Sequence, residues 1–484
     1  MNAPENLPLH AGLSRRADRS LAEQLAEQFA QRIRQRLLMA GARLPSVREC
    51  ARRHGLSPST VVAAYDRLLA AGLIEARKQR GFFVRETQPG GHGPEPRHAA
   101  GAAQPRWPLP VSATTLIRGM FQAPGALPMP GLGTLPVDWL DLPLLANALR
   151  KVGRGAGLSD CSLRYGEPAG ASRLRQALVP MLAEHGVNAS AQQLIATIGA
   201  TQALDVVTRT LLRAGDSVLV DEPGWAVEYA RLAALGMRVL PVPRGDEGPD
   251  LGVMQQLIEQ HQPRLYVTVS VLHNPTGASL SLHHAHQVLQ LAEKHDLYIV
   301  EDDTYAHLAP AHLPRLAALD GLRRTFYVSS FSKILAPNWR VGYLAAPMAW
   351  VDRLVDTKLL STLTTPGLTE LALAHCLEQG LLRRHAERVM QRLDVARARA
   401  VHAAQQQGFV FAAPPRGLFG WVDTGIDTER IAEAMLEQGW LIAPGALFHA
   451  VHRPTTLMRI NFATTQHNAF WQGLRQTCNQ SSRR

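Results

Sequence analysis

The stretch TFYVSSFSK, residues 325–333, decides the fold class. It begins with the aromatic and β-branched residues of a buried strand and ends on small polar residues and a lysine. Stretches with helical periodicity separate it from four similar runs, which are SVLVD (217–221), RLYVTVS (264–270), LYIVED (297–302) and VGYLAA (341–346). Short apolar strands alternating with helices predict an α/β fold with a mostly parallel sheet covered on both faces.

Charged and polar residues follow the predicted strands. Lys333 comes directly after the strand of residues 325–330, Asp302 ends LYIVED, and HNPTG (273–277) follows RLYVTVSVL. A lysine at a strand end is usually a surface lysine. Polar groups at the ends of neighbouring strands in an open α/β sheet converge on one crevice, however. We therefore expect these residues in one site.

The residue types fit pyridoxal phosphate. A desolvated Lys333 would form the Schiff base. Asp302 would pair with the pyridinium nitrogen and keep the ring an electron sink. Asn274 and Tyr305 would hydrogen-bond the phenolic oxygen of the cofactor.

A second group of residues suits the cofactor's phosphate. Arg340 offers a bidentate clamp, together with Ser330. Ala200 and Thr201, in the stretch GATQ (199–202), precede an apolar helical run and would supply the backbone N–H groups of a helix N-terminus.

Two further residues have two interpretations each. Trp225, in DEPGW (221–225), would stack on the ring face or is a buried core residue. Arg459, in LMRINFA (457–463), would bind the α-carboxylate of a substrate or forms a structural salt bridge.

The N-terminal fifth has a different pattern. Ser20 and Glu23 form a capping box before a helix with an apolar stripe at Leu21, Leu25, Phe29, Ile33 and Leu37. A second helix starts at a further capping box, Ser46 to Glu49, and a third follows Ser57-Pro58 and ends at Gly72. Two short strands joined by a basic turn, 78–81, follow. This order predicts an α+β winged helix-turn-helix, although other small three-helix domains share the helical pattern.

Charge supports DNA as the partner of this module. Residues 1–90 hold 15 Lys and Arg against 8 Asp and Glu, which is most of the chain's net charge of +11. In a winged helix-turn-helix the third helix enters the major groove. The expected DNA contacts are Arg48, Ser57, Ser59, Thr60, Lys78 and Arg80. A solvated basic surface is the alternative.

Composition sets the remaining limits. The chain has 484 residues, with 46% hydrophobic and 19% charged, so wholesale disorder is excluded. Its four cysteines are scattered without a CxxC pair, which favours a reducing compartment and no metal site. The sequence shows no secretory signal and no membrane-spanning run, so we expect a cytoplasmic protein. The expected domains are a winged helix over 15–86, a Pro/Gly-rich linker over 87–120 and an α/β domain over 121–484.

Two known families share these motifs. LPSVRECARRHGLSPSTVVAAYDRLLAAGLI (44–74) resembles the GntR family of regulators, except that Pro58 stands where that family often has an arginine. YGEPAG (165–170), GATQAL, DEPGW, HNPTG, EDDTY (301–305), SFSK and MRINF resemble, in order, the fold-type I, class I aminotransferases. The combination resembles the MocR subfamily of GntR-type transcriptional regulators.

The resemblance carries its own implications. Fold-type I domains have a smaller C-terminal subdomain and form sites at a dimer interface, so Tyr165 would reach the phosphate in the neighbouring subunit. It also implies a homodimer, head-to-tail, in which the cofactor domain senses pyridoxal phosphate or an amino compound.

Two functions remain open. The first is a regulator that binds a double-stranded DNA operator and responds to pyridoxal phosphate or to an amine or amino acid effector. The second is an active aminotransferase that carries a DNA-binding module. A store for the cofactor without DNA binding would leave the basic module unexplained.

Overall fold

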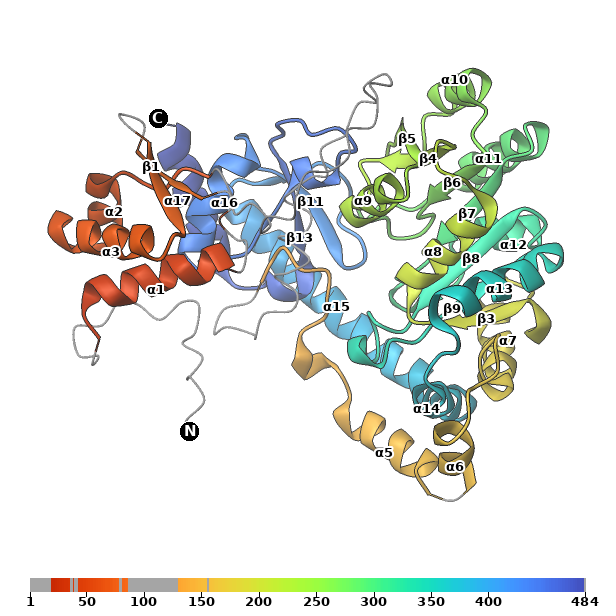
Figure 1. Cartoon of the computed structure of the whole chain (residues 1–484). Helices are drawn as coiled ribbons and strands as arrows, with labels where there is room; N and C mark the ends of the chain where they lie inside the picture. The colour runs from red at the N-terminus through yellow and green to blue at the C-terminus, as the bar shows by residue number, and fades with distance from the viewer. Residues whose placement is uncertain are drawn as a thin grey trace, which may run out of the picture. The chain divides into compact units, whose positions relative to one another are not determined.

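The structure is a computed structural model, and it describes residues 19–34, 38, 42–77, 81–85, 129–154 and 156–482 (Figure 1). The chain divides into two compact units, Met1–Leu127 and Pro128–Arg484, each described by itself. The predicted linker lies outside the described residues. The domain boundaries given above therefore stay predictions.

The first unit is three helices followed by a hairpin. Its elements are α1 (Leu21–Arg34), α2 (Val47–His54), α3 (Pro58–Ala70), β1 (Ile74–Arg77) and β2 (Gly81–Val84). The first capping box forms as predicted, because the Glu23 N–H donates to the Ser20 hydroxyl at 3.2 Å and the Glu23 carboxylate accepts the Ser20 N–H at 2.9 Å. At the second, the Ser46 hydroxyl accepts the Glu49 N–H at 3.2 Å. The antiparallel pair β1–β2 completes the predicted winged helix-turn-helix.

The core of this unit comes from the apolar stripe of α1 and the buried face of α3. Leu25 and Phe29 are buried, and the Phe29 ring meets the Tyr65 ring edge-on with centroids 5.8 Å apart. The Tyr65 hydroxyl donates to the Pro45 carbonyl at 2.8 Å, which ties α3 to the start of α2. Leu37, predicted at the end of the stripe, lies outside the described residues.

The second unit contains a seven-stranded sheet in the order β3-β9-β8-β7-β6-β4-β5. Its strands are β3 (Leu194–Thr197), β4 (Ser217–Glu222), β5 (Arg238–Pro243), β6 (Leu265–Thr268), β7 (Tyr298–Asp302), β8 (Thr325–Ser330) and β9 (Gly342–Ala345). Only β9 runs against its neighbours, pairing antiparallel with β3 and β8. The predicted mostly parallel sheet is confirmed.

Strand alternation builds a core on each face of this sheet. Val218 and Val220 of β4 pack into one core with α8 (Ala200–Leu211), whereas Leu219 packs into the other with α11 (Leu282–Lys294). Helices therefore lie on both sides of the strands (Figure 1). The helices and 3-10 turns that precede or surround this sheet are η1 (Val137–Trp139), α5 (Leu142–Val152), α6 (Ala156–Ser162), α7 (Ser172–Glu184), η2 (Ala191–Gln193), α9 (Ala226–Ala234), α10 (Leu251–His261), η3 (Ala306–Leu308), α12 (Leu316–Asp320), η4 (Pro337–Trp339), η5 (Met348–Trp350), α13 (Val351–Thr362) and α14 (Gly367–Glu378).

A smaller antiparallel sheet follows, as the resemblance implies. Its order is β10-β11-β13-β12, and the long helix α15 (Leu381–Gln406) runs to it from α14 (Figure 1). The remaining elements are β10 (Val410–Phe411), β11 (Phe419–Asp423), α16 (Thr428–Glu437), β12 (Ala443–Pro444), η6 (Gly445–Phe448), β13 (Leu457–Asn461), η7 (Phe462–Thr464) and α17 (Asn468–Ser482). Among the described residues, no helix is long and apolar enough to cross a membrane.

Candidate functional site

The predicted site residues gather at one edge of the large sheet. β4, β6, β7 and β8 are parallel, so their carboxyl ends lie at the same edge. Asp302 and Ser330 end β7 and β8, and Asn274 follows β6. Because β9 is antiparallel, its first residue, Gly342, pairs with Ser330 and with Thr197 at that same edge. Arg340, two residues before Gly342, therefore reaches the site from the N-terminal end of β9.

Lys333 lies just beyond the end of β8, with its side chain partly buried. Burial lowers the pKa of its amine to about 8, and the guanidinium groups of Arg459 and Arg340 act in the same direction while Asp302 opposes them. A lowered pKa makes a neutral, nucleophilic amine available near neutral pH. The charged side chains of Arg459, Arg340 and Asp302 therefore lie close enough to Lys333 in the folded chain to shift its pKa.

Three consecutive acidic residues, 301–303, have three different environments. Glu301 accepts N–H groups of Leu316 and Ala317 at 2.8 Å each, at the start of α12. Asp303 pairs with the buried Arg315 at 2.6 Å. Asp302 instead accepts bonds only from the nearby residue Thr304, among the described contacts. Burial raises the pKa of Asp302 to about 6, so its carboxylate favours a cationic partner.

Arg340 lies against the start of α8. Its Nη2 donates to the Ile198 carbonyl at 2.9 Å and its Nη1 to the Ser332 hydroxyl at 3.1 Å. A Cβ added at Gly199 would fall 2.5 Å from Arg340 Nη2. Gly199, with a left-handed φ of 82°, is the N-cap of α8, whose first residues are Ala200 and Thr201. A guanidinium beside a helix N-terminus is suited to a phosphate.

Arg459 is a buried cation without a carboxylate partner among the described residues. Its Nη1 donates to the Asn274 side-chain oxygen at 2.8 Å, and its Nη2 to the Gly131 carbonyl. The rings of Phe419 and Phe448 flank its guanidinium, with centroids at 4.5 and 5.0 Å. Its Nε has no hydrogen-bond partner in the described part of the chain. The predicted alternative, a structural salt bridge, is not formed within residues 129–154 and 156–482.

The aromatic candidates differ in exposure. Tyr305 is buried, and its ring meets Phe419 edge-on with centroids 5.2 Å apart. Trp225 is half-buried and precedes α9, so it is not a core residue. Tyr165 is 82% exposed on the surface of this chain. Ser330 is buried at the end of β8.

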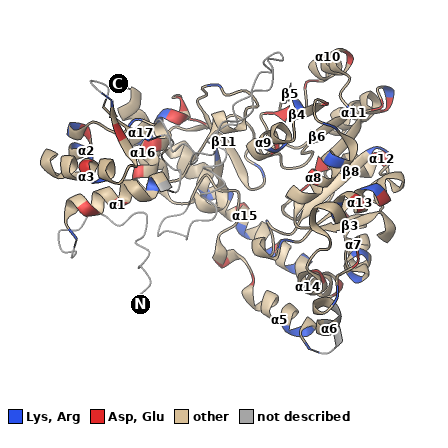
Figure 2. Ribbon diagram, in the orientation of Figure 1, with Lys and Arg blue, Asp and Glu red and all other residues tan. Residues whose placement is uncertain are grey.

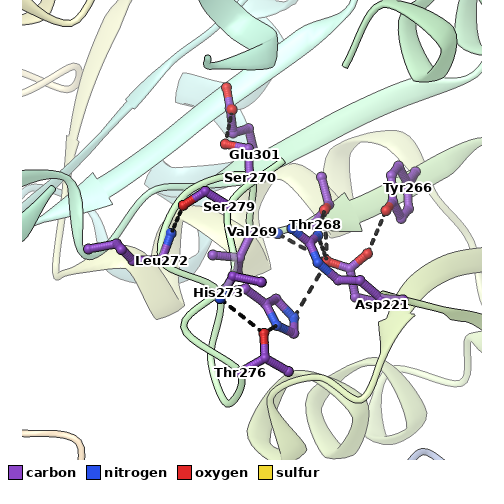
Figure 3. A network of polar contacts seen from close by, with 12 residues as sticks. Asp221, Tyr266, Thr268, Val269, Ser270, Leu272, His273, Thr276, Ser279 and Glu301 are labelled. Carbon is purple, nitrogen blue, oxygen red and sulfur yellow. Dashed lines mark hydrogen bonds and ion pairs between the residues drawn. The ribbon is translucent and has the colours of Figure 1, made fainter. Parts of the chain in front are cut away.

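A network of buried polar contacts includes Asp221, near the end of β4, and His273, directly before Asn274 (Figure 3). Asp221 accepts hydrogen bonds from Arg244 at 2.9 Å and from Thr268 at 2.7 Å. His273 Nε2 lies 3.7 Å from the Asp221 carboxylate, and its Nδ1 lies 3.0 Å from the Thr276 hydroxyl. Burial and the charge of Arg244 lower the pKa of His273 to about 3, so the ring is neutral.

The residues present fit pyridoxal phosphate. Lys333 would supply the amine, Asp302 a carboxylate whose raised pKa suits a pyridinium partner, and Arg340 with the start of α8 a cradle that a Cβ at Gly199 would fill. The Nε of Arg459, which has no partner among residues 129–154 and 156–482, would leave a donor for a carboxylate. Sequence reasoning assigned no role of their own to Gly199 and Ser332, although they stand in the motifs GATQAL and SFSK. It missed Phe419 and Phe448, which stand in none of its motifs.

The first unit exposes several of its predicted DNA contacts. Arg48, Ser57 and Ser59 are exposed and Thr60 is half-buried. The Ser57 hydroxyl accepts the Thr60 N–H at 3.2 Å and lies 2.8 Å from that of Ser59, so it caps α3. Lys78 and Arg80 lie outside the described residues.

Two further arginines flank the wing. Arg43 is exposed, and its Nε lies 3.4 Å from a Cβ added at Gly81. Arg77 lies over the Phe83 ring, 4.6 Å from its centroid. Acidic residues lie on the helices as well (Figure 2), and Glu23 pairs with Arg67 at 2.8 Å. The wing and the start of α2 therefore carry basic side chains that sequence reasoning only partly identified.

Comparison with known families agrees with this geometry. The profile of class I and II aminotransferases matches residues 133–470, and that of the bacterial gntR regulatory proteins matches residues 21–84. The chain belongs to the class I and II aminotransferase family and joins that domain to a gntR-type DNA-binding domain. The predicted resemblance to MocR-type regulators is confirmed.

Its relatives include regulators and enzymes. The uncharacterized HTH-type transcriptional regulator YisV of Bacillus subtilis is 27% identical over 88% of this chain and 88% of its own length. The 2-aminoadipate transaminase of Thermus thermophilus is 28% identical over 76% of this chain and 93% of its own. The crystal structure of LysN, the α-aminoadipate aminotransferase of Thermus thermophilus complexed with N-(5'-phosphopyridoxyl)-L-leucine, superposes with a TM-score of 0.68 and 26% identity, covering 75% of this chain and 93% of that one.

Proposed function

We propose that this protein is a DNA-binding transcriptional regulator whose aminotransferase-like unit binds pyridoxal phosphate and senses it or an amino compound. The observation that carries the proposal is the pairing, in one chain, of a winged helix exposing Arg48 and Ser59 with a site that retains Lys333, Asp302 and Arg340. A metabolic enzyme gains nothing from the winged helix. The regulator YisV, similar along most of the chain, supports the same function.

Each site residue then has a defined task. The amine of Lys333 attaches the cofactor, and Arg340 with the N-terminus of α8 and Ser330 holds its phosphate. Asp302 holds a proton on the ring nitrogen, while Tyr305 and Asn274 bind the phenolic oxygen and Trp225 covers the ring face. Bound in this way, the cofactor would supply an electron sink and an aldehyde carbon at which an incoming amine could replace that of Lys333. Arg459 binds the effector's carboxylate.

We propose that the working unit is a homodimer, head-to-tail. Leu163, Tyr165, Leu360 and Leu363 are 54–92% exposed. A Cβ added at Gly166 would lie 3.8 Å from Thr364 Cβ, so the residues around 165 and 363 are neighbours. Exposed apolar clusters of this kind mark interaction surfaces. Tyr165 would reach the cofactor phosphate of the second subunit.

A chain that binds an operator works where the chromosome is, which fits a cytoplasmic protein.

The alternative function is an aminotransferase that carries a DNA-binding module. One observation favours it, because the Lys333, Asp302 and Arg459 set is complete and the similar 2-aminoadipate transaminase is an enzyme. Both functions predict cofactor binding. They differ in whether the cofactor state changes DNA binding.

The deciding experiment measures operator affinity in three states of the full chain. A band-shift titration on DNA upstream of its own gene compares cofactor-free protein, loaded protein, and loaded protein with amino acids, at matched salt. Allosteric coupling is typically about 5–150-fold, so we expect a change in that range. Lys333→Ala should blunt the response, whereas Lys151→Ala, an exposed lysine on α5, should not. Equal affinity in all states, with sustained amine transfer, would favour the aminotransferase.

A further inference from the structure

A second buried lysine lies outside the site. Lys358, on α13, is fully buried, and its ammonium donates to the Pro168 carbonyl at 2.8 Å and to the Thr365 hydroxyl at 3.4 Å. The Thr365 hydroxyl in turn donates to Glu370, on α14, whose other carboxylate oxygen accepts the Ala171 N–H at 2.7 Å. The three side chains form a continuous polar chain between two main-chain groups of one loop.

That loop, residues 165–171, carries Tyr165 at its beginning. Ala171 is the N-cap of α7 and offers no side-chain cap; its own N–H is bound by the Glu370 carboxylate, and the N–H of Ser172 by Glu167 at 2.8 Å. Gly166 lies beside the Thr364–Thr365 segment, because a Cβ added there would be 3.6 Å from the Thr365 carbonyl oxygen. Thr365 therefore lies beside the residue that follows Tyr165, while Lys358 and Glu370 bind the same loop at Pro168 and Ala171.

Burying these two charges is costly. A buried ion pair is often no more stabilising than apolar residues of the same volume. Lys358 and Glu370 are 0% and 2% exposed, yet they are joined only through the Thr365 hydroxyl. An arrangement that gives little stability but fixes two backbone groups suits a positioning role. It leaves Tyr165 pointing away from its own chain, 82% exposed.

We propose that Lys358, Thr365 and Glu370 are positioning residues that hold residues 165–171 so that Tyr165 reaches the cofactor phosphate of the second subunit. This inference rests on the dimer and the cofactor of the proposed function. It assigns these three residues a task in the partner's site rather than in their own. Their loss should therefore act across the interface.

Mixed dimers test this directly. In the first, one chain carries Lys333→Ala and Lys358→Met and the other is unchanged, so the only lysine-bound cofactor faces a damaged loop. In the second, one chain carries Lys333→Ala and the other Lys358→Met, so the only lysine-bound cofactor faces an intact loop. The visible absorbance of the lysine-bound cofactor reports solely on the chain that keeps Lys333.

Cofactor release should be about tenfold faster in the first dimer than in the second, the effect of losing one hydrogen bond to a charged group. Tyr165→Phe in place of Lys358→Met should give the same pattern. If the second dimer is the faster, Lys358 serves only its own chain's fold, and the proposal is overturned. Equal rates overturn it as well.

Two further variants guard against misfolding. Thr365→Val interrupts the polar chain with little change in volume and should reproduce the effect of Lys358→Met. Arg173→Met breaks the surface pair with Glu378, at 2.6 Å between the same helices α7 and α14, and should leave release unchanged. If the unchanged protein is a monomer or binds no cofactor, the proposed function itself fails, and that result is distinct from any ratio between the two dimers.

Discussion

The guanidinium of Arg459 donates to the side-chain oxygen of Asn274 across 2.8 Å, and this bond joins the small sheet to the loop after β6. Asn274 is expected at the phenolic oxygen of the cofactor, and Arg459 at the carboxylate of the effector. A carboxylate that draws Arg459 toward itself would change the bond that Asn274 receives. With these assignments, we expect effector binding and cofactor electronics to be coupled through this one hydrogen bond.

Arg459→Lys should weaken amino acid binding by about 10–100-fold while the protein keeps its cofactor, since an ammonium cannot reproduce the guanidinium fork. The same variant should shift the visible absorbance of the cofactor, because Asn274 loses its donor. Spectral titration with amino acids measures both effects. Arg475→Lys is the matched control, since Arg475 also lies over a ring, 4.1 Å from the Phe409 centroid, but outside the site. Unchanged affinity in Arg459→Lys would remove Arg459 from the effector site.

Gly199→Ala should release the cofactor's phosphate. A Cβ there falls 2.5 Å from Arg340 Nη2, so the guanidinium must leave the N-terminus of α8. Gly215→Ala is the control, because Gly215 also has a left-handed φ, 97°, but nothing lies within 4 Å of its added Cβ. Both variants should lose about 1 kcal/mol of stability through backbone strain. Only Gly199→Ala should lower cofactor affinity, by about tenfold or more, in an equilibrium titration.

The motifs predicted most of the site because each follows a strand, and parallel strands place their carboxyl ends at one edge. Asp302, Ser330 and Asn274 could be found in this way. The antiparallel direction of β9 could not, because an apolar run such as VGYLAA has the same pattern in either direction. Phe419 and Phe448 were also missed, since they lie in and beside the small sheet and approach Arg459 only in the tertiary structure.

Asp302→Asn and Asp303→Asn should differ sharply although the residues are adjacent. Asp303→Asn leaves the guanidinium of Arg315, 0% exposed, without its carboxylate and should cost about 3–5 kcal/mol of stability. Asp302→Asn should keep the fold and the cofactor but slow amine exchange, because the ring nitrogen loses its proton-holding partner. Chemical denaturation and exchange kinetics measure the two effects. Normal exchange in Asp302→Asn would exclude Asp302 as the ring's partner.

In the cofactor-free protein, titration of Asp302 should make the stability of the fold depend on pH. Its pKa is raised by burial to about 6 in the folded chain, against about 4 when unfolded, so the folded state binds the proton more tightly. The unliganded protein should therefore gain stability relative to Asp302→Asn as the pH falls from about 7 to about 4, by about 2–3 kcal/mol. Denaturant unfolding of both proteins across this range tests the sign. A difference that is flat with pH would contradict it.

DNA binding should depend on Arg48 and on the wing. Arg48 is exposed on the first turn of α2, and each basic side chain that binds a phosphate releases counterions. Arg48→Ala should lower affinity for all sequences and flatten the slope of log affinity against log salt by about one. Neutralising Lys78 and Arg80 together should flatten the slope by about one for each phosphate that is no longer bound. Arg67→Ala is the control, because Arg67 is exposed on α3 but pairs with Glu23 at 2.8 Å. If Arg67→Ala changes the slope and Arg48→Ala does not, the DNA-binding face lies on the α1–α3 side of this unit, not at α2 and the wing.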